Sequence, residues 1–301
     1  MPNNTNTSGM PTSLLTNFKV VTKMGLSISV VFSSVAGYLL AVETIHFPTL
    51  FLLAIGGYFM VGASNVFNQI IERDLDALMD RTKNRPIPTG RMSVTNAFVL
   101  AVVLSVAGLS ILYTINEITA MFGAISICLY TSAYTPLKQK TSLSVFVGAI
   151  PGAIPFMLGW VAATGKFGIE PGALFILQFF WQFPHFWAIG WFLHDDYQKA
   201  GFNMLPTGKR DKGTALQSIT YIAWTVLISI VPVFGFTGSL SLTVPAAILV
   251  FACGLLFLFF GFQLFKNQTE KSARQLMLAS VVYITTIQII YVLDKFIRLW
   301  I

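Results

Sequence analysis

The sequence predicts an all-α polytopic membrane protein, folded as a single bundle of nine transmembrane helices. Hydrophobic residues make up 55% of the 301 residues, and charged residues make up only 10%, against about 25% in soluble proteins. So few polar side chains do not cover a water-soluble surface of this size. Apolar runs of about 20 residues, the length that crosses a bilayer core about 30 Å thick, recur along the whole chain.

The apolar runs follow one another without a linker long enough to separate two domains. Because they are continuous rather than alternating, they do not read as the strands of a membrane barrel. Prolines inside several runs are tolerated in membrane helices and can kink them; these are Pro151, Pro155, Pro184 and Pro232. In chain order the expected helices span residues 24–43, 47–70, 94–114, 117–135, 143–163, 171–192, 215–236, 243–264 and 276–297.

The N-terminal segment, residues 1–18, is rich in Asn, Thr and Ser and predicts a short disordered lead. It lacks the basic start and apolar core of a signal peptide. The remaining residues, 19–301, are expected to form one intramembrane domain.

The basic residues predict which end of the bundle faces the cytoplasm. With a cytoplasmic N-terminus, nine crossings leave only Lys166, Lys295 and Arg298 outside, so 16 of the 19 Lys and Arg lie inside. The positive-inside rule therefore places the C-terminus outside. Topology and attraction to anionic lipids explain most of the basic excess, but they do not explain the acids on the same side. Six of the 12 acids crowd into two loops there: Glu72, Asp74, Asp76, Asp80, Asp195 and Asp196.

A first polar cluster follows the second apolar run. Four oxygen-bearing side chains recur every four residues: Asn68, Glu72, Asp76 and Asp80. If the helix continues, they form one stripe with steps of about 6 Å. Hard oxygen ligands suit Mg²⁺ shared with substrate phosphates, and the basic Arg81, Lys83 and Arg85 come next to match phosphate oxygens. This pattern favours a diphosphate site, and the alternative is a solvated, salt-bridged helix end.

A second polar cluster lies at the end of the sixth run, where two of the three histidines, three tryptophans and an acidic pair fall close together. Asp195 and Asp196 are suited to a second Mg²⁺ facing the first stripe, with Lys199 as a phosphate partner. At the C-terminal end of a helix the macrodipole disfavours carboxylates, and a bound cation would offset this. Taken singly, each aspartate also reads as a plain helix-terminal residue.

The residues from Asn68 to Gly90 are ordered as Asn-x3-Glu-x2-Leu-Asp-x2-Met-x-Arg-Thr-x2-Arg-x4-Gly. This pattern closely resembles the signature of the UbiA-type intramembrane prenyltransferases. The resemblance implies a nine-helix bundle that uses Mg²⁺ and joins a polyprenyl diphosphate to an aromatic or macrocyclic acceptor.

Further segments are similar to the branch of that family that farnesylates protoheme. They are Trp181-Gln-Phe-Pro-His-Phe-Trp187, His194-Asp-Asp-Tyr197 with the residues up to Pro206, Tyr134-Thr-Pro-Leu-Lys138, and Gly152 to Trp160. The resemblance implies transfer of farnesyl from farnesyl diphosphate to a vinyl group of protoheme IX, giving haem O. The implied setting is a bacterial inner membrane, with a downstream haem A synthase or the oxidase assembly machinery as possible partners and no nucleic acid.

The site residues divide by role. The catalytic set is expected to be Asn68, Glu72, Asp76 and Asp196, and Asp195 joins these four as a Mg²⁺ ligand. The residues expected to clamp the diphosphate are Arg81, Lys83, Arg85, Lys138 and Lys199. On the acceptor side we expect His185, as a haem iron ligand, and Tyr197. His194 lies nine residues after His185, so along one helix the two rings point to opposite faces.

Two other functions remain open at this stage. One is a UbiA-type enzyme with a quinone or chlorin acceptor, against which the segments around His185 and Tyr197 argue. The other is a transporter or a haem-binding membrane protein. Transporters place ionisable groups near the membrane midplane, whereas nearly every charge here is expected at the helix ends.

Overall fold

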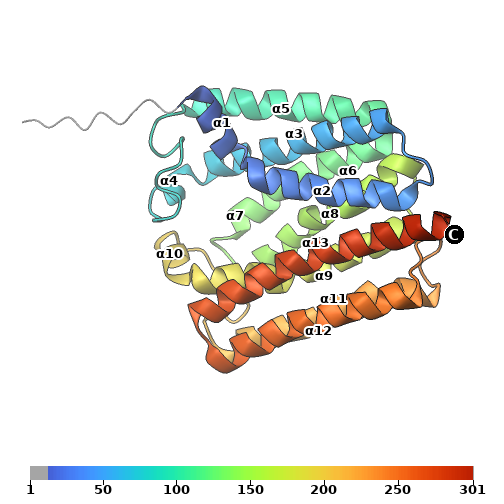
Figure 1. The fold of residues 1–301 in the computed structure, drawn as a ribbon. Coiled ribbons are helices and arrows are strands. Elements are labelled where there is room, and N and C mark those ends of the chain that lie inside the picture. The colour runs from blue at the N-terminus through green and yellow to red at the C-terminus, as the bar shows by residue number, and fades with distance from the viewer. Residues whose placement is uncertain (1–12, 301) are drawn as a thin grey trace, which may run out of the picture.

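The computed structural model describes residues 13–300, and over that range the chain is helical with no strand (Figure 1). The predicted all-α fold is confirmed. Three short helices, α1 (Leu14–Val21), α4 (Arg73–Asp76) and α10 (His194–Lys199), accompany the long ones. The long elements are α2 (Met24–Ala41), α3 (Phe47–Ile71), α5 (Val94–Ile115), α6 (Glu117–Cys128) with η1 (Leu129–Tyr134) and α7 (Thr135–Leu137), α8 (Ser144–Thr164), α9 (Ile169–Phe192), α11 (Lys212–Ile230) with η2 (Val231–Phe234), α12 (Val244–Asn267) and α13 (Glu270–Trp300).

Eight helices among the described residues are long and apolar enough to cross a membrane, so the predicted count of nine is not confirmed. The long helix outside that set is α9, which has 24 residues. It carries Gln178, Gln182 and His185, whose polar side chains lower its mean hydropathy. Because α9 packs against α8, α11 and α13, these polar groups have protein neighbours rather than lipid alone. The long helix that falls outside the set is thus an inner element of the bundle.

The N-terminal boundary differs from the sequence prediction. Residues 1–12 lie outside the described residues, but helix α1 already begins at Leu14, so the lead does not extend to residue 18 as a disordered segment. The side chain of Ser13 accepts a hydrogen bond from the backbone N–H of Thr16. This is an N-cap, which satisfies one of the free amides of the first turn.

The helices pack in two groups that meet at α8 and α9 (Figure 1). Helices α2, α3, α5 and α6 lie on one side, and α11, α12 and α13 lie on the other. The backbones of α2 and α8 touch, since a Cβ added at Gly159 would overlap the carbonyl oxygen of Ser34. Small residues that allow such close approach are typical of helix interfaces in membranes.

All the short polar segments gather at one end of the bundle. Figure 1 shows α4, α7 and α10 at the same end as α1, opposite the C-terminus. The up-and-down course of the long helices brings them together, because α3, α6 and α9 all run toward that end. The fold therefore places the two polar clusters of the sequence side by side.

Candidate active site at one end of the bundle

Asn68, Glu72 and Asp76 of the first cluster form the predicted stripe, but the helix does not continue to Asp80. Backbone bonds run from Glu72 N–H to Asn68 O (2.9 Å) and from Asp76 N–H to Glu72 O (2.7 Å). The expected continuation to Asp80 is wrong. The carbonyl of Asp76, which a longer helix would use for the Asp80 amide, accepts instead from the hydroxyl of Thr82 at 2.9 Å. The chain therefore turns, and Asp80 is exposed beyond the stripe.

The acids of the stripe are buried and paired with bases. Glu72 and Asp76 are 4% and 0% exposed. Lys138 Nζ lies 2.7 Å from Glu72 Oε1, and Arg85 Nη1 lies 2.7 Å from Asp76 Oδ2. The other carboxylate oxygen of Asp76, Oδ1, is buried without a hydrogen-bond partner. A buried anionic oxygen without a donor is costly, so this atom indicates a place for a cation.

Lys138 reaches Glu72 from the end of α7, which follows a π-helical turn. The six residues of η1, Leu129–Tyr134, form this turn, a distortion that is common at functional sites. The Lys138 ammonium lies 4.6 Å from the ring centroid of Tyr134 and 5.6 Å from that of Phe202. Burial lowers the pKa of Lys138, but the Glu72 carboxylate together with Tyr130 and Tyr197 raises it, and the net result is a raised pKa. This ammonium therefore stays charged.

Asn68 is the first residue of the stripe, one helical turn before Glu72. Its side-chain amide donates to Thr135 Oγ1 at 3.1 Å, which ties α3 to the start of α7. The hydroxyl of Thr135 donates in turn to the carbonyl of Tyr130 (2.8 Å), inside the π-helical turn. The residues that orient Asn68 and Lys138 thus belong to one segment.

The second cluster lies on a new helix, contrary to the sequence prediction. Helix α9 ends at Phe192 and α10 begins at His194, so Asp195 and Asp196 occupy the first turn of α10. The macrodipole favours carboxylates at that position, and the expected dipole penalty does not arise. The break at Leu193 also removes the continuous helix on which the half-turn relation of His185 and His194 depended.

Asp196 joins the two clusters across 116 residues of sequence. Its carboxylate accepts backbone N–H bonds from Asp80 (2.7 Å) and Arg81 (3.2 Å). Burial raises the pKa of Asp196, but these two amides and Lys199 hold it below its usual value. Lys199 also pairs with Asp80, which lies 2.6 Å from Lys83. Asp196 therefore fixes the turn that carries the basic residues of the first cluster.

The other predicted site residues lie around this junction. Asp195 points away from the stripe, with its side chain 79% exposed and paired with Arg210. The guanidinium of Arg81 lies 6.0 Å from the ring centroid of Tyr197. Among the described residues, no three His, Cys, Asp or Glu side chains form a group that could hold a metal. The assignment of five metal ligands stays a prediction.

Lys23 is a site residue that the sequence reasoning missed. It joins α1 to α2 in the left-handed backbone region, with φ of 47°, a conformation that is uncommon for residues other than glycine. Burial, Arg85 and Lys138, in that order, lower its pKa to about 7. Within residues 13–300 its ammonium has no ion-pair partner. In sequence Lys23 is one more base before an apolar run, and only the fold reveals its neighbours.

His185 lies one to two turns before the site end of α9 and faces α13. Its Nδ1 is 2.7 Å from Ser280 Oγ. The imidazole stacks on Trp181 with ring centroids 4.8 Å apart, and the indole N–H of Trp181 donates to the carbonyl of Ser280 at 2.7 Å. The position of Trp181 is that of a packing residue between α9 and α13.

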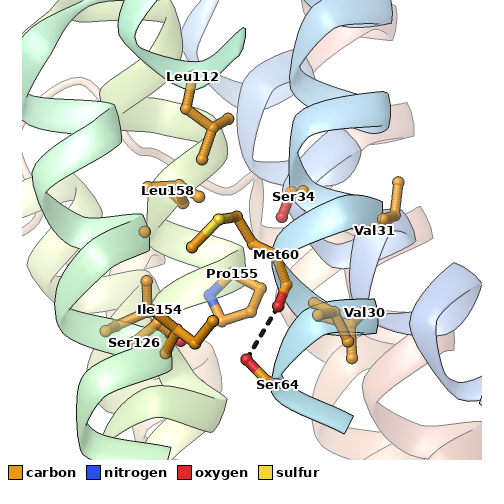
Figure 2. Close-up of a pocket in the computed structure, with 14 residues that line it drawn as sticks. Val30, Val31, Ser34, Met60, Ser64, Leu112, Ser126, Ile154, Pro155 and Leu158 are labelled. Atoms are coloured by element: carbon orange, nitrogen blue, oxygen red, sulfur yellow. Dashed lines mark hydrogen bonds between the residues drawn. The ribbon is translucent and has the colours of Figure 1, made fainter. Parts of the chain in front are cut away.

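A largely apolar cavity lies deeper in the bundle along the same helices (Figure 2). Ser64 and Met60 line it from α3, one and two turns before Asn68, respectively. Ser126 lines it from α6, one turn before Tyr130. Because Pro155 on α8 has no N–H, the carbonyl of Pro151 is left without its helical donor, and Ser126 Oγ supplies one at 3.4 Å.

The sequence profile of the UbiA prenyltransferase family matches residues 30–285. The chain belongs to this family. Among the UbiA prenyltransferases of known structure, a digeranylgeranylglyceryl phosphate synthase superposes with a TM-score of 0.77 at 17% identity, covering 94% of this chain and 98% of its own. A homologue from Archaeoglobus fulgidus bound to DMAPP and Mg²⁺ superposes with a TM-score of 0.71 at 15% identity, covering 93% and 99%.

Curated sequences include much more similar members of the family. A protoheme IX farnesyltransferase from Christiangramia forsetii is 66% identical over 99% of both chains. A protoheme IX farnesyltransferase from Flavobacterium psychrophilum is 65% identical over 95% of this chain and 96% of its own. The UbiA resemblance predicted from the motifs is thereby confirmed across nearly the full length.

Proposed function

We propose that this UbiA prenyltransferase transfers the farnesyl group of farnesyl diphosphate to one carbon of a vinyl group of protoheme IX. Water adds to the other vinyl carbon, which is left as a cation, and the products are haem O, diphosphate and a proton. The observation that carries the proposal is the 66% identity, over 99% of both chains, with a protein named protoheme IX farnesyltransferase. The site supports it, because buried acids for a metal stand beside buried bases for phosphate.

The residues of the first cluster fit Mg²⁺. The orphaned Oδ1 of Asp76 and the nearby oxygens of Glu72 and Asn68 are the hard donors that this ion prefers. These three would hold the ion, with Asp196 as a further ligand from the second cluster, whereas the predicted ligand Asp195 is exposed and pairs with Arg210 instead. When bound, Mg²⁺ neutralises charge on the departing diphosphate. The Archaeoglobus fulgidus homologue with bound Mg²⁺ supports this assignment.

The basic residues stabilise the diphosphate as the allylic C–O bond breaks and its electron pair leaves with the oxygen. Lys138 and Arg85 are buried at the stripe, and their charges help to lower the pKa of Lys23. Such fixed cations in a site with little water act strongly on developing negative charge. The predicted Arg81, Lys83 and Lys199 lie on the turn and on α10, at the outer edge of the site.

The cavity of Figure 2 gives the prenyl tail a place along α3. From Asn68 to Met60 the helix rises about 12 Å, at 1.5 Å per residue, which is comparable to a farnesyl chain. The cavity lies deeper in the bundle than the basic residues. The apolar helix faces between the two keep water from the allylic carbon. The tail therefore enters the first helix group while its diphosphate stays at the end of the bundle.

On the acceptor side, we assign His185 as the haem iron ligand and Tyr197 as a wall of the site. The basic residues at the site end support an orientation in a bacterial inner membrane with this end cytoplasmic and the C-terminus outside. A haem A synthase or the oxidase assembly machinery would receive the product.

The decisive experiment supplies the purified protein with haem, farnesyl diphosphate and Mg²⁺ and records product mass and diphosphate release. We expect a farnesylated haem and one diphosphate per product. Prenylation of a quinone or chlorin instead would show a different acceptor. Haem binding without diphosphate release would favour a haem-binding or transport protein.

A further inference from the structure

Helix α13 holds the imidazole of His185 through one serine. Ser280, fully buried, places its Oγ 2.7 Å from His185 Nδ1 and 2.6 Å from the carbonyl oxygen of Met277. A carbonyl oxygen only accepts, so the single hydroxyl hydrogen of Ser280 points to Met277. The contact with His185 is then left to a hydrogen on the imidazole nitrogen.

This arrangement selects one form of the neutral imidazole. In that form Nδ1 carries the hydrogen and donates it to Ser280 Oγ, while Nε2 keeps its lone pair. The alternative form, with hydrogen on Nε2, would bring two acceptors, Nδ1 and Oγ, together without a hydrogen between them. The form with a free Nε2 is the one that ligates a metal.

The ring is also held in position. Trp181 stacks against it, and the Trp181 indole donates to the backbone carbonyl of the same Ser280. Among the described residues, His185 Nε2 has no hydrogen-bond partner, and it is absent from the fully enclosed unpartnered atoms. A ring fixed on one nitrogen and open on the other is arranged to bind through the open one.

The open nitrogen lies on the polar face of α9. Gln178 and Gln182 occupy the two preceding turns of that face, where Gln182 donates to the carbonyl of Ala149 on α8 (2.8 Å) and Gln178 lies 3.5 Å from Gln288 on α13. This face of α9 therefore lies inside the bundle, between α8 and α13.

We propose that Ser280 is a positioning residue for the acceptor, which keeps His185 in the Nδ1–H form so that Nε2 ligates the iron of the substrate haem. This inference rests on the proposed function. Partners of this kind on the far nitrogen of a ligating histidine orient the ring and raise its basicity, and their loss costs about 10–100-fold in affinity.

The test compares Ser280→Ala with Ser229→Ala. Ser229 is a matched control, since it is also buried, donates to the carbonyl three residues before it (Val226), and accepts from a ring hydroxyl (Tyr283). For Ser280→Ala we expect a shifted Soret band of bound ferric haem, haem affinity lower by about tenfold, and a higher KM for haem. The KM for farnesyl diphosphate stays unchanged. Ser229→Ala leaves all of these unchanged.

The positioning role of Ser280, the ligand role of His185 and the proposed function are each contradicted by a different result. Wild-type haem spectrum and KM in Ser280→Ala would refute the positioning role. An unaltered spectrum in His185→Ala would refute the ligand assignment beneath it. If the wild-type protein binds haem through His185 but never releases diphosphate, the positioning role stands and the proposed function falls. Unfolding temperatures and diphosphate binding of each variant establish that a weaker haem site is not a misfolded protein.

Discussion

The ammonium of Lys138 lies 2.7 Å from the carboxylate of Glu72, in the interior of the protein and across 66 residues of sequence. Both side chains are nearly inaccessible, at 11% and 5% exposure. Each charge therefore depends on the other for compensation before any substrate arrives. The same holds for Arg85 and Asp76, so the acids proposed for the metal and the bases proposed for phosphate are already assembled as pairs.

Removing one member of the Lys138–Glu72 pair should cost stability as well as activity. Glu72→Gln leaves a buried ammonium without its counter-charge, and we expect a loss of about 3–5 kcal/mol in the free energy of unfolding. Adding Lys138→Met should restore much of that stability while turnover stays absent. Denaturant unfolding in detergent and a product assay measure the two effects. A stable single variant would show that the pair is not electrostatically coupled.

Asp76→Ala should abolish turnover while the protein still inserts and folds, because the carboxylate is proposed both to bind the metal and to hold Arg85. Asp74→Ala is the matched control on the same short helix, since its side chain is 87% exposed and contacts only Arg73. We expect near-normal turnover for that control. Near-normal activity in purified Asp76→Ala would remove Asp76 from the metal site.

Substitutions of Asp196 and of Asp195 should have different effects, although the two residues are neighbours in the sequence. Asp196→Ala frees the amides of Asp80 and Arg81, and the displaced basic turn should lower kcat/KM for farnesyl diphosphate by about 100-fold. Hydrogen exchange over residues 77–90 should rise in the same variant. Asp195→Ala, which loses a surface contact with Arg210, should change both measurements much less; equal effects of the two variants would contradict the clamp.

Lys23 predicts a specific pH dependence. Its pKa in the folded protein, about 7, lies below the ordinary value of 10.5, with burial first and Arg85 and Lys138 next as causes. Below pH 7 the folded state carries the unfavourable charge in full. Between pH 7 and about 10 the unfolded state binds more protons, so stability rises with pH. The unfolding temperature of the wild type should increase over this range relative to Lys23→Met.

A bound diphosphate should reverse that shift. An anion beside Lys23 favours the charged ammonium, so binding at pH 7.5 should take up a proton. Calorimetry of diphosphate binding in two buffers of different ionisation enthalpy measures the uptake. Lys23→Met should show less uptake than the wild type, and identical uptake in both would place Lys23 outside the diphosphate site.

The cavity predicts a change in prenyl chain length. A Cβ added at Gly57 meets only Val31, at 3.8 Å, so Gly57→Leu should fold and extend into the space proposed for the tail. We expect kcat/KM for farnesyl diphosphate to fall at least tenfold relative to geranyl diphosphate. Gly172→Leu, at a glycine with open space around it, is the control. An unchanged preference in Gly57→Leu would place the tail elsewhere.

The sequence alone determined the helical membrane architecture, the family and the residue types of both polar clusters. Apolar runs and motif spacing are local properties of the chain, and they survive folding unchanged. Local sequence also predicted a helix through Asp80 and a continuous helix past Leu193, and both predictions were wrong. At Asp80 a tertiary contact replaces the helical bond, since Asp196 accepts from the Asp80 amide. At Leu193 helix α9 has ended, and a new helix begins at His194.

Only the tertiary structure determined which distant residues contact one another in the site. Glu72 with Lys138, Asp196 with the amide of Asp80, and His185 with Ser280 join segments between 66 and 116 residues apart. Spacing along one helix does not encode such partners, because they depend on how separate helices pack. Lys23 shows the same limit: its charge is known from the sequence, but its lowered pKa arises first from burial in the fold and then from the bases Arg85 and Lys138 near it.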